Sequence, residues 1–302
     1  MHSKKPEPYF VTGILICLLG AVCFSTKAIF VKVAYRETPV DAVTLLALRM
    51  IFSLPFFVVS AWWSSSRSGN VKFSWRQWLG VAGIGCVGYY ISSLLDFIGL
   101  QYVSAGMERL ILFVYPTVVL ILSAVFVRIK VKPMQWLAVA VTYVGLIIAF
   151  WGEVSFEGHG PDFYTGALLI FACAITYAIY IVGSGRLIPT IGAAKFNSYA
   201  MSFAAAAVII HFAAVSDQSL FNFTSDVYLY SFMMAIVSTV IPSYLIAEGI
   251  RRVGSNNAAV IGSIGPVSTI VQAYFFLQEP IHAAQLAGTA LVLAGILMIS
   301  RK

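Results

Sequence analysis

The sequence predicts an all-α membrane protein with ten transmembrane helices in two inverted repeats of five helices. Of its 302 residues, 60% are hydrophobic and only 10% are charged, whereas roughly 25% are charged in an ordinary soluble domain. This composition excludes a soluble enzyme, a disordered scaffold and a disulfide-rich secreted module, because too few polar groups are present to cover a soluble surface. The apolar residues form long uncharged runs, which favours membrane-crossing helices over an outer-membrane barrel.

Ten such runs follow one another along the chain, most of them near the ~20 residues that cross a bilayer. The first run follows Lys4 and Lys5 and is longer than the core of a cleavable signal peptide, so we expect a retained first helix. The breaks between runs carry turn residues. The expected spans are 10–34, 40–62, 75–97, 103–127, 134–151, 164–186, 195–215, 227–250, 255–277 and 282–300.

The basic residues predict the orientation of these spans. With a cytoplasmic N-terminus, 14 of the 19 basic residues fall on the cytoplasmic side, and only Lys32 and Arg36 fall outside. Cytoplasmic loops of membrane proteins carry this excess of Lys and Arg, so we expect both termini in the cytoplasm. The formal charge of +7 therefore reflects membrane topology, and no nucleic-acid partner is expected.

An internal repeat divides the chain into two halves, 1–152 and 163–302. Residues 97–150 align without a gap on residues 247–300, at an offset of 150, and near the start of each half a shorter similarity has an offset of 153. Because each half contains an odd number of helices, the halves must cross the membrane in opposite senses. Inverted repeats of this kind place a site near the midplane, between the halves.

The repeat matches two prolines, Pro116 and Pro266. A proline inside a helix removes a backbone hydrogen bond and crowds the preceding turn. In lipid, the freed carbonyl needs a polar partner or water, which favours a position facing a cavity. We therefore expect matched kinks that act as hinges.

Three charged residues within spans are candidates for substrate contact: Lys27, Glu108 and Arg109. Lys27 either anchors a substrate carboxylate or pairs with a carboxylate on another helix; Tyr180 is its counterpart at the offset of 153, and we expect both to line one cavity. Glu108 and Arg109 either bind substrate or belong to a salt-bridge network, in which Arg109 reaches Asp96 or Asp96 caps a turn. For Arg49, a structural role is the favoured interpretation.

Side chains with an apolar body and a polar tip supply the remaining candidates, because small-molecule sites are mostly apolar with a few polar groups. For any single tyrosine, packing or a place in the interface belt is the favoured explanation. Glycines before Tyr89 and Tyr90 predict close helix contact. The candidates are Tyr89, Tyr90, Tyr177, Tyr180, Ser243, Tyr244 and Ser263.

Two related patterns, Val103-Ser-Ala-Gly…Pro116 and Val253-Gly-Ser-Asn…Pro266 followed by Gln278-Glu279-Pro280, resemble the paired EamA-type repeats of the drug/metabolite transporter superfamily. The stretch Phe24–Lys32 resembles the opening of that family's first helix, with Phe24 in place of the usual Trp. The first half has Arg128-Ile-Lys130 where the family often has a Gly-Glu pair. The resemblance covers roughly residues 11–300 and implies ten helices, an inner-membrane location and export of small metabolites, amino acids among them.

Together these observations predict a secondary exporter of small amphipathic metabolites, best matched by amino acids, that works by alternating access around a central cavity. A drug or sugar-phosphate carrier of the same superfamily, or a channel-like pore, remains an alternative. The sequence has no H-E-x-x-H, P-loop or G-x-S-G motif, so no enzymatic activity, cofactor or metal is expected. The expected partners are a small-molecule substrate and the lipid bilayer, and the oligomeric state is left open.

Overall fold

The computed structural model describes residues 7–66, 72–127, 133–157, 161–216, 218–262 and 264–300, which form helices joined by short connections, without a strand. The first half contributes α1 (Glu7–Glu37), α2 (Ala42–Ser66), α3 (Trp75–Gly85), the π-helix η1 (Cys86–Ile91), α4 (Ser92–Gly99), α5 (Ala105–Leu112), α6 (Tyr115–Val127) and α7 (Pro133–Glu157). The second half contributes α8 (Pro161–Ile191), α9 (Ala193–Val215), α10 (Ser225–Ala235), η2 (Ile236–Val240), α11 (Ile241–Val253), α12 (Ser255–Ile261), α13 (Ile264–Gln272), η3 (Ala273–Leu277) and α14 (Ala283–Ser300).

Within the described ranges, eight helical stretches are long and apolar enough to cross a membrane. They are Tyr9–Glu37, Ala42–Ser66, Trp75–Gly99, Ala105–Phe126, Asp162–Ile191, Ala193–Val215, Ser225–Val253 and Ser255–Leu277. The other two expected spans fall on α7 and α14, whose apolar stretches Trp136–Ala149 and Ala283–Gly295 are shorter. Large apolar side chains such as Trp62 and Trp151 are exposed on the outside of the bundle, as expected where lipid covers the surface. The chain is a multi-pass integral membrane protein.

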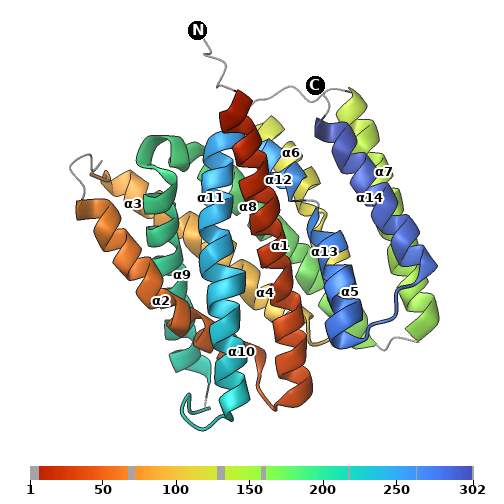
Figure 1. The fold of residues 1–302 in the computed structure, drawn as a ribbon, viewed down its shortest axis with the longest axis horizontal. Helices are drawn as coiled ribbons and strands as arrows, with labels where there is room; N and C mark the ends of the chain where they lie inside the picture. Colours follow the sequence, from red (N-terminus) through yellow and green to blue (C-terminus); the bar gives the residue numbers. More distant parts are fainter. Residues whose placement is uncertain are drawn as a thin grey trace.

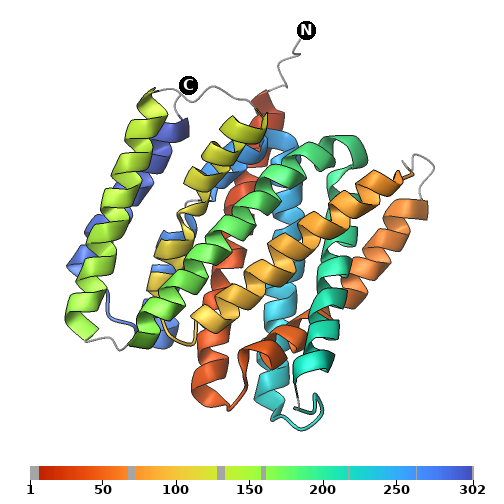
Figure 2. The ribbon, with the colours of Figure 1, turned by 180° about the vertical axis from the view of Figure 1, so that it is seen from behind.

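Helices of the first half pack on helices of the second, so the two halves share one core. Helix α1 lies against α11 and α13, α2 lies against α9, and α8 lies against α4 and α6. Figures 1 and 2 show α7 and α14 as a pair along one side of the bundle, and the start of α1 near the end of α14. The first and last described helices thus have their outer ends on the same face of the molecule.

The α7–α14 pair depends on two glycines. A Cβ added to Gly145 would lie 2.6 Å from the carbonyl oxygen of Gly288, and one added to Gly288 would lie 2.5 Å from the carbonyl oxygen of Gly145. The two backbones therefore touch, which is the way small residues let membrane helices associate without a hydrophobic driving force.

The two spans that contain the matched prolines Pro116 and Pro266 are broken, where kinks in continuous helices were expected. Helix α5 ends at Leu112 and α6 begins at Tyr115, directly before Pro116; α12 ends at Ile261 and α13 begins at Ile264, two residues before Pro266. The pyrrolidine ring clashes with the carbonyl four residues earlier, which explains why each preceding helix ends about four residues before its proline. Each break leaves two helical segments where the sequence pattern predicts one span.

The spans 75–97 and 227–250 of the sequence analysis also contain a feature that hydropathy does not predict. Each includes a π-helical turn, η1 at Cys86–Ile91 and η2 at Ile236–Val240. Helix α8 approaches the first of these so closely that a Cβ on Gly88 would lie 2.3 Å from the Cβ of Tyr180. The close contact expected from the glycines of this span is therefore present at Gly88.

Candidate functional site: a buried charge cluster beside an aromatic cavity

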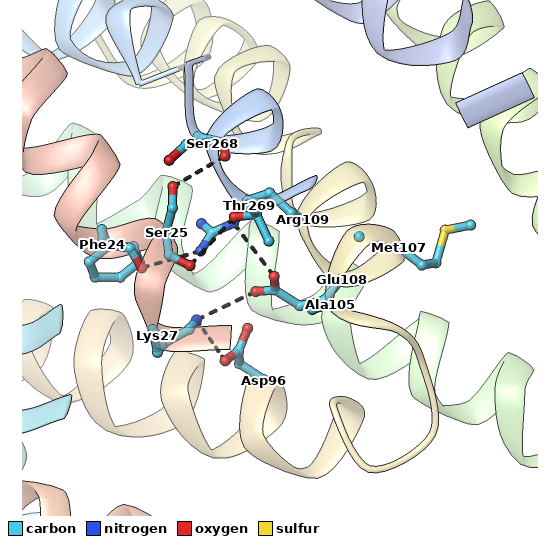
Figure 3. Close-up of polar contacts among 12 residues, drawn as sticks. Phe24, Ser25, Lys27, Asp96, Ala105, Met107, Glu108, Arg109, Ser268 and Thr269 are labelled. Carbon is cyan, nitrogen blue, oxygen red and sulfur yellow. Dashed lines mark hydrogen bonds and ion pairs between the residues drawn. The ribbon is translucent and has the colours of Figure 1, made fainter. Parts of the chain in front are cut away.

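Four charged side chains meet in the middle of the bundle (Figure 3). Lys27 of α1 lies 2.7 Å from Asp96 of α4 and 3.5 Å from Glu108 of α5, measured from Nζ to the carboxylate oxygens. Arg109 Nε lies 3.5 Å from Glu108 Oε2. All four side chains are at most 6% exposed. This cluster, Lys27–Asp96–Glu108–Arg109, is called the charge cluster below.

Helix α5 holds Glu108 and Arg109 in different directions, because neighbouring residues on a helix point about 100° apart. Glu108 turns toward Lys27, whereas Arg109 donates from Nε to Thr269 Oγ1 at 3.1 Å and from Nη2 to the carbonyl oxygen of Phe24 at 3.3 Å. Arg109 therefore connects α5 with both α1 and α13. Asp96 pairs with Lys27 at 2.7 Å, which agrees with the alternative that Lys27 pairs with a carboxylate on another helix, and the Arg109–Asp96 pair considered from the sequence is not the one formed.

A fifth buried charge lies in the first half. Arg49 of α2 is 2% exposed, and its guanidinium carbon lies 4.7 Å from the centre of the Phe97 ring. Its Nε and Nη2 atoms have no hydrogen-bond partner among the described residues. Three basic and two acidic side chains therefore occupy this interior, which leaves one positive charge unbalanced when all five are ionised.

Next to the charge cluster lies a small cavity walled by aromatic rings. The rings of Phe24 and Tyr177 stack at 6.0 Å with an interplanar angle of 21°, and Tyr115 meets Tyr177 edge-on at 5.1 Å. Tyr115 donates its hydroxyl to the carbonyl oxygen of Ala259 at 3.0 Å. The lining residues are Cys17, Ala21, Phe24, Arg109, Leu112, Phe113, Tyr115, Tyr177, Ile181, Ile246, Ala258, Gly262 and Gly265.

The cavity volume is about 40 Å³, enough for a few water molecules but far below the 300–1,000 Å³ typical of a site that holds a small organic ligand. Its walls come from both halves: α1, α5 and α6 on one side, and α8, α11 and α12 on the other. The cavity therefore lies between the two halves of the chain, and at this volume it does not accommodate a small organic ligand.

Of the candidates from the sequence, the structure brings Arg109 and Tyr177 to this cavity. Lys27 and Tyr180, which the sequence predicts to line one cavity, are not among the described residues that line this one. Lys27 turns away to Asp96, and Tyr180 packs beneath Tyr177, with ring centres 5.9 Å apart. The phenol of Tyr180 also meets Tyr89 edge-on at 4.8 Å.

The remaining candidates lie elsewhere. Tyr90 packs against His211. Ser243 accepts a hydrogen bond from Asn197 Nδ2 at 3.0 Å, and the Tyr244 hydroxyl lies 2.8 Å from the Ser198 hydroxyl. These contacts tie α11 to α9 and are away from the cavity. Ser263 lies outside the described residues. Pro116 and Pro266 follow the helix breaks that border the cavity at Phe113 and Gly262.

Sequence reasoning missed the aromatic wall. Phe24 begins the stretch that resembles the first helix of the family, and Tyr115 directly precedes Pro116. Both positions could therefore have been chosen as candidates from the sequence. Thr269, which receives the Arg109 hydrogen bond, had no such signal, because a threonine in an apolar helix is common and usually bonds to its own backbone.

A membrane bundle with a closed, polar-ended cavity between two halves defines the class: a polytopic transport protein. Comparison with known proteins agrees. The profile of the EamA-like transporter family matches residues 11–151 and 164–301. An uncharacterized transporter of Bacillus subtilis, YcbK, is 33% identical over 285 residues, covering 91% of this chain and 88% of that protein. The chain belongs to the EamA-like transporter family, within the drug/metabolite transporter superfamily.

More distant proteins agree with this assignment. An uncharacterized transporter of Synechocystis is 23% identical, over 95% of this chain and 93% of that protein. A protein crystal structure has the same fold, with a TM-score of 0.72 at 16% sequence identity, covering 96% of both chains. The family match and the Bacillus relative show a membrane transporter, and the solved structure shows that the same fold covers nearly all of both chains.

Proposed function

We propose that this transporter is a secondary exporter of small amphipathic metabolites that carry a carboxylate, with amino acids as the best-matched class. One observation carries the proposal: Arg109 lies in the wall of an aromatic cavity, beside a buried interior with one unbalanced positive charge. An unbalanced charge in the membrane interior is costly. A substrate carboxylate at the cavity would be attracted to this positive charge, and the ammonium of an amino acid would need a separate carboxylate partner.

Arg109 is better suited to this role than Lys27. The Lys27 ammonium is held between two carboxylates, at 2.7 and 3.5 Å, and has little charge left to offer. Arg109 uses Nε and Nη2 for Thr269 and Phe24, but a guanidinium has five N–H donors in a planar fork that matches a carboxylate. Its position in the cavity wall presents that fork to the substrate.

The rest of the cavity suits the apolar part of such a molecule. Rings of Phe24, Tyr115 and Tyr177 and the small residues Ala258 and Gly262 line it. Glu108, the neighbour of Arg109 in the sequence, is buried against Lys27 and Arg109, and we propose that it turns to a substrate ammonium when the site opens. Arg109 is the basic residue among the described lining residues, whereas a sugar-phosphate carrier would be expected to have several bases around its dianionic substrate.

We further propose alternating access between ten spans in two inverted repeats, 1–152 and 163–302. Several paired features support it. Phe24 and Tyr177, which stack across the cavity, are 153 residues apart, the offset of the early repeat. The π-helices η1 and η2 begin 150 residues apart, which is also the separation of Pro116 and Pro266. Paired elements around one cavity are what inverted repeats produce.

The proposed location is the cell inner membrane, with both termini in the cytoplasm. The excess of basic residues on that side supports this orientation, as does the position of the start of α1 and the end of α14 on one face (Figure 1).

The test is counterflow in proteoliposomes with a panel of radiolabelled amino acids, together with their methyl esters and sugar phosphates. We expect saturable exchange of at least one amino acid that has a free carboxylate. Arg109→Lys keeps the positive charge but loses the planar, two-pronged guanidinium. The loss of one charge-assisted hydrogen bond should weaken the affinity for the carboxylate substrate by about 10- to 150-fold. Arg251→Lys, at an exposed ion pair with Glu248, is the matched control and should exchange normally. Non-saturating flux would favour a pore, and exchange restricted to esters or phosphates would refute the carboxylate site.

A further inference from the structure

The first turn of α5 is held by a side chain from the other half of the protein. The amides of Ala105 and Gly106 donate to the two oxygens of the Glu279 carboxylate, at 3.0 and 3.2 Å. The amide of Met107 donates to Ser104 Oγ at 3.0 Å, and the amide of Glu108 donates to the Ser104 carbonyl oxygen at 2.9 Å. The amides of Ala105, Gly106 and Met107, which have no partner within the helix, are therefore all satisfied, two of them across the boundary between the halves.

The surrounding chain is shaped around this contact. Gln278, directly before Glu279, has a left-handed backbone with φ of 57°, which an ordinary residue adopts at a cost and which suggests a constrained position. On the other side, a Cβ on Gly106 would lie 2.3 Å from Gln285 Nε2. Gln285 of α14 is 7% exposed. The start of α5 is therefore in contact with Glu279 of the connection on one side and with Gln285 of α14 on the other.

The Glu279 carboxylate also lines a hollow of about 300 Å³, together with Lys32, Tyr35, Arg36 and Leu277. Two of these lining residues, Lys32 and Arg36, are basic, so positively charged side chains surround the Glu279 carboxylate. An ionised carboxylate on two backbone amides forms charge-assisted hydrogen bonds, which are roughly twice as strong as neutral ones. The residues that line this hollow come from the last turns of α1 and from the junction of η3 with the connection to α14, and Figure 1 shows both segments at the end of the bundle away from the start of α1.

The opposite end of the same boundary is built differently. The counterpart of α5 in the second half is α12, which begins after Gly254, a residue with no side chain that could cap it. The sequence position 150 residues before Glu279 is Ile129, which cannot supply a carboxylate. Among the residues that the structure describes, a carboxylate bound to the start of a helix across the two halves is therefore found in only one of the two related places.

We propose that Glu279 is a latch that closes the outer side of the transporter by holding α5 against the second half. Arg109 lies on α5, one turn beyond the clasped amides, so release of the latch frees the helix that carries the substrate anchor. Because the other end has no matching carboxylate, the latch biases the resting protein toward an outward-closed state. This proposal rests on the proposed transport function and orientation.

The test measures conformation without needing a substrate. The four native cysteines are first replaced by serine. Ala273→Cys then places a thiol on η3, six residues before Glu279, at a position that is 2% exposed. A membrane-impermeant thiol reagent is added to right-side-out vesicles, and the labelling rate is measured. Glu279→Gln keeps the shape but removes the charge, and we expect labelling about tenfold faster, the equivalent of losing one charge-assisted bond.

Glu37→Gln is the matched control, because Glu37 lies on the same expected outer side and accepts a hydrogen bond from Tyr230 without touching α5. It should label at the parent rate. Glu279→Asp shortens the reach and should give an intermediate rate, which keeps the test decisive if Glu279→Gln fails to fold. Parent-like labelling in both folded Glu279 variants overturns the latch. Absence of counterflow with every substrate, combined with faster labelling, overturns the transport proposal and leaves the latch standing.

Discussion

Replacing Lys27 with Met separates the two roles that the sequence allows for this lysine. The change keeps the length of the side chain and removes its charge. In the structure, the ammonium lies 2.7 Å from Asp96 and 3.5 Å from Glu108, so the substitution leaves two buried carboxylates with less compensation. We therefore expect Lys27→Met to act on stability first, and on substrate affinity only indirectly.

The magnitude follows from these two distances. At an effective dielectric constant of about 20, the attraction of Lys27 is about 6 kcal/mol to Asp96 and about 5 kcal/mol to Glu108. Burying the ammonium costs several kcal/mol, which offsets much of this attraction. Removing one partner of a buried ion pair costs about 3–5 kcal/mol, and we expect the free energy of unfolding to fall by that amount.

The assay is equilibrium unfolding of the purified protein in mixed micelles. Lys27→Met combined with Asp96→Asn removes one charge of each sign and should recover about 2 kcal/mol of the loss, as expected for residues in direct contact. Lys32→Met, on the same helix but near its end, should cost less than about 1 kcal/mol. A Lys27→Met protein of parental stability that binds carboxylate substrates more weakly would refute this reasoning and restore Lys27 as the anchor.

Two further predictions concern the breaks and the topology. Replacing Pro116 and Pro266 together by Ala should allow the broken spans to form continuous helices, because the clash with the preceding turn is gone; we expect normal membrane insertion but slower counterflow, and parental rates at equal protein amounts would remove the prolines from the mechanism. Reporter fusions after residues 70, 130, 190 and 302 should report the cytoplasm, and those near 158 and 220 the outside. A periplasmic signal at the C-terminus would contradict both the orientation and the inverted repeat.

The sequence by itself determined the class of this protein. Long uncharged runs place the helices, since a chain in lipid must satisfy its backbone hydrogen bonds within each helix. Eight of the expected spans coincide closely with apolar helices of the structure, and the proline positions mark where two of them break. The family resemblance was confirmed because its motif residues are local patterns along the chain.

Pairing between distant helices was beyond the reach of the sequence. Arg109 was identified as a candidate, but nothing in a linear pattern shows that Asp96 would pair with Lys27. Similarly, the sequence predicts a cavity at Lys27 and Tyr180, whereas the cavity of the structure is lined by Phe24 and Tyr177. The difference is less than one helical turn, which is smaller than the accuracy with which the ends of a span can be predicted.

The tertiary structure alone decided which polar groups satisfy one another. The contact between Glu279 and the start of α5 joins residues more than 170 positions apart, and a glutamate in a loop gives no sign of its partner. Hydropathy records how each residue interacts with solvent, whereas partner choice depends on which helix faces come within hydrogen-bond reach. That information exists only after α1, α5, α13 and α14 have packed together.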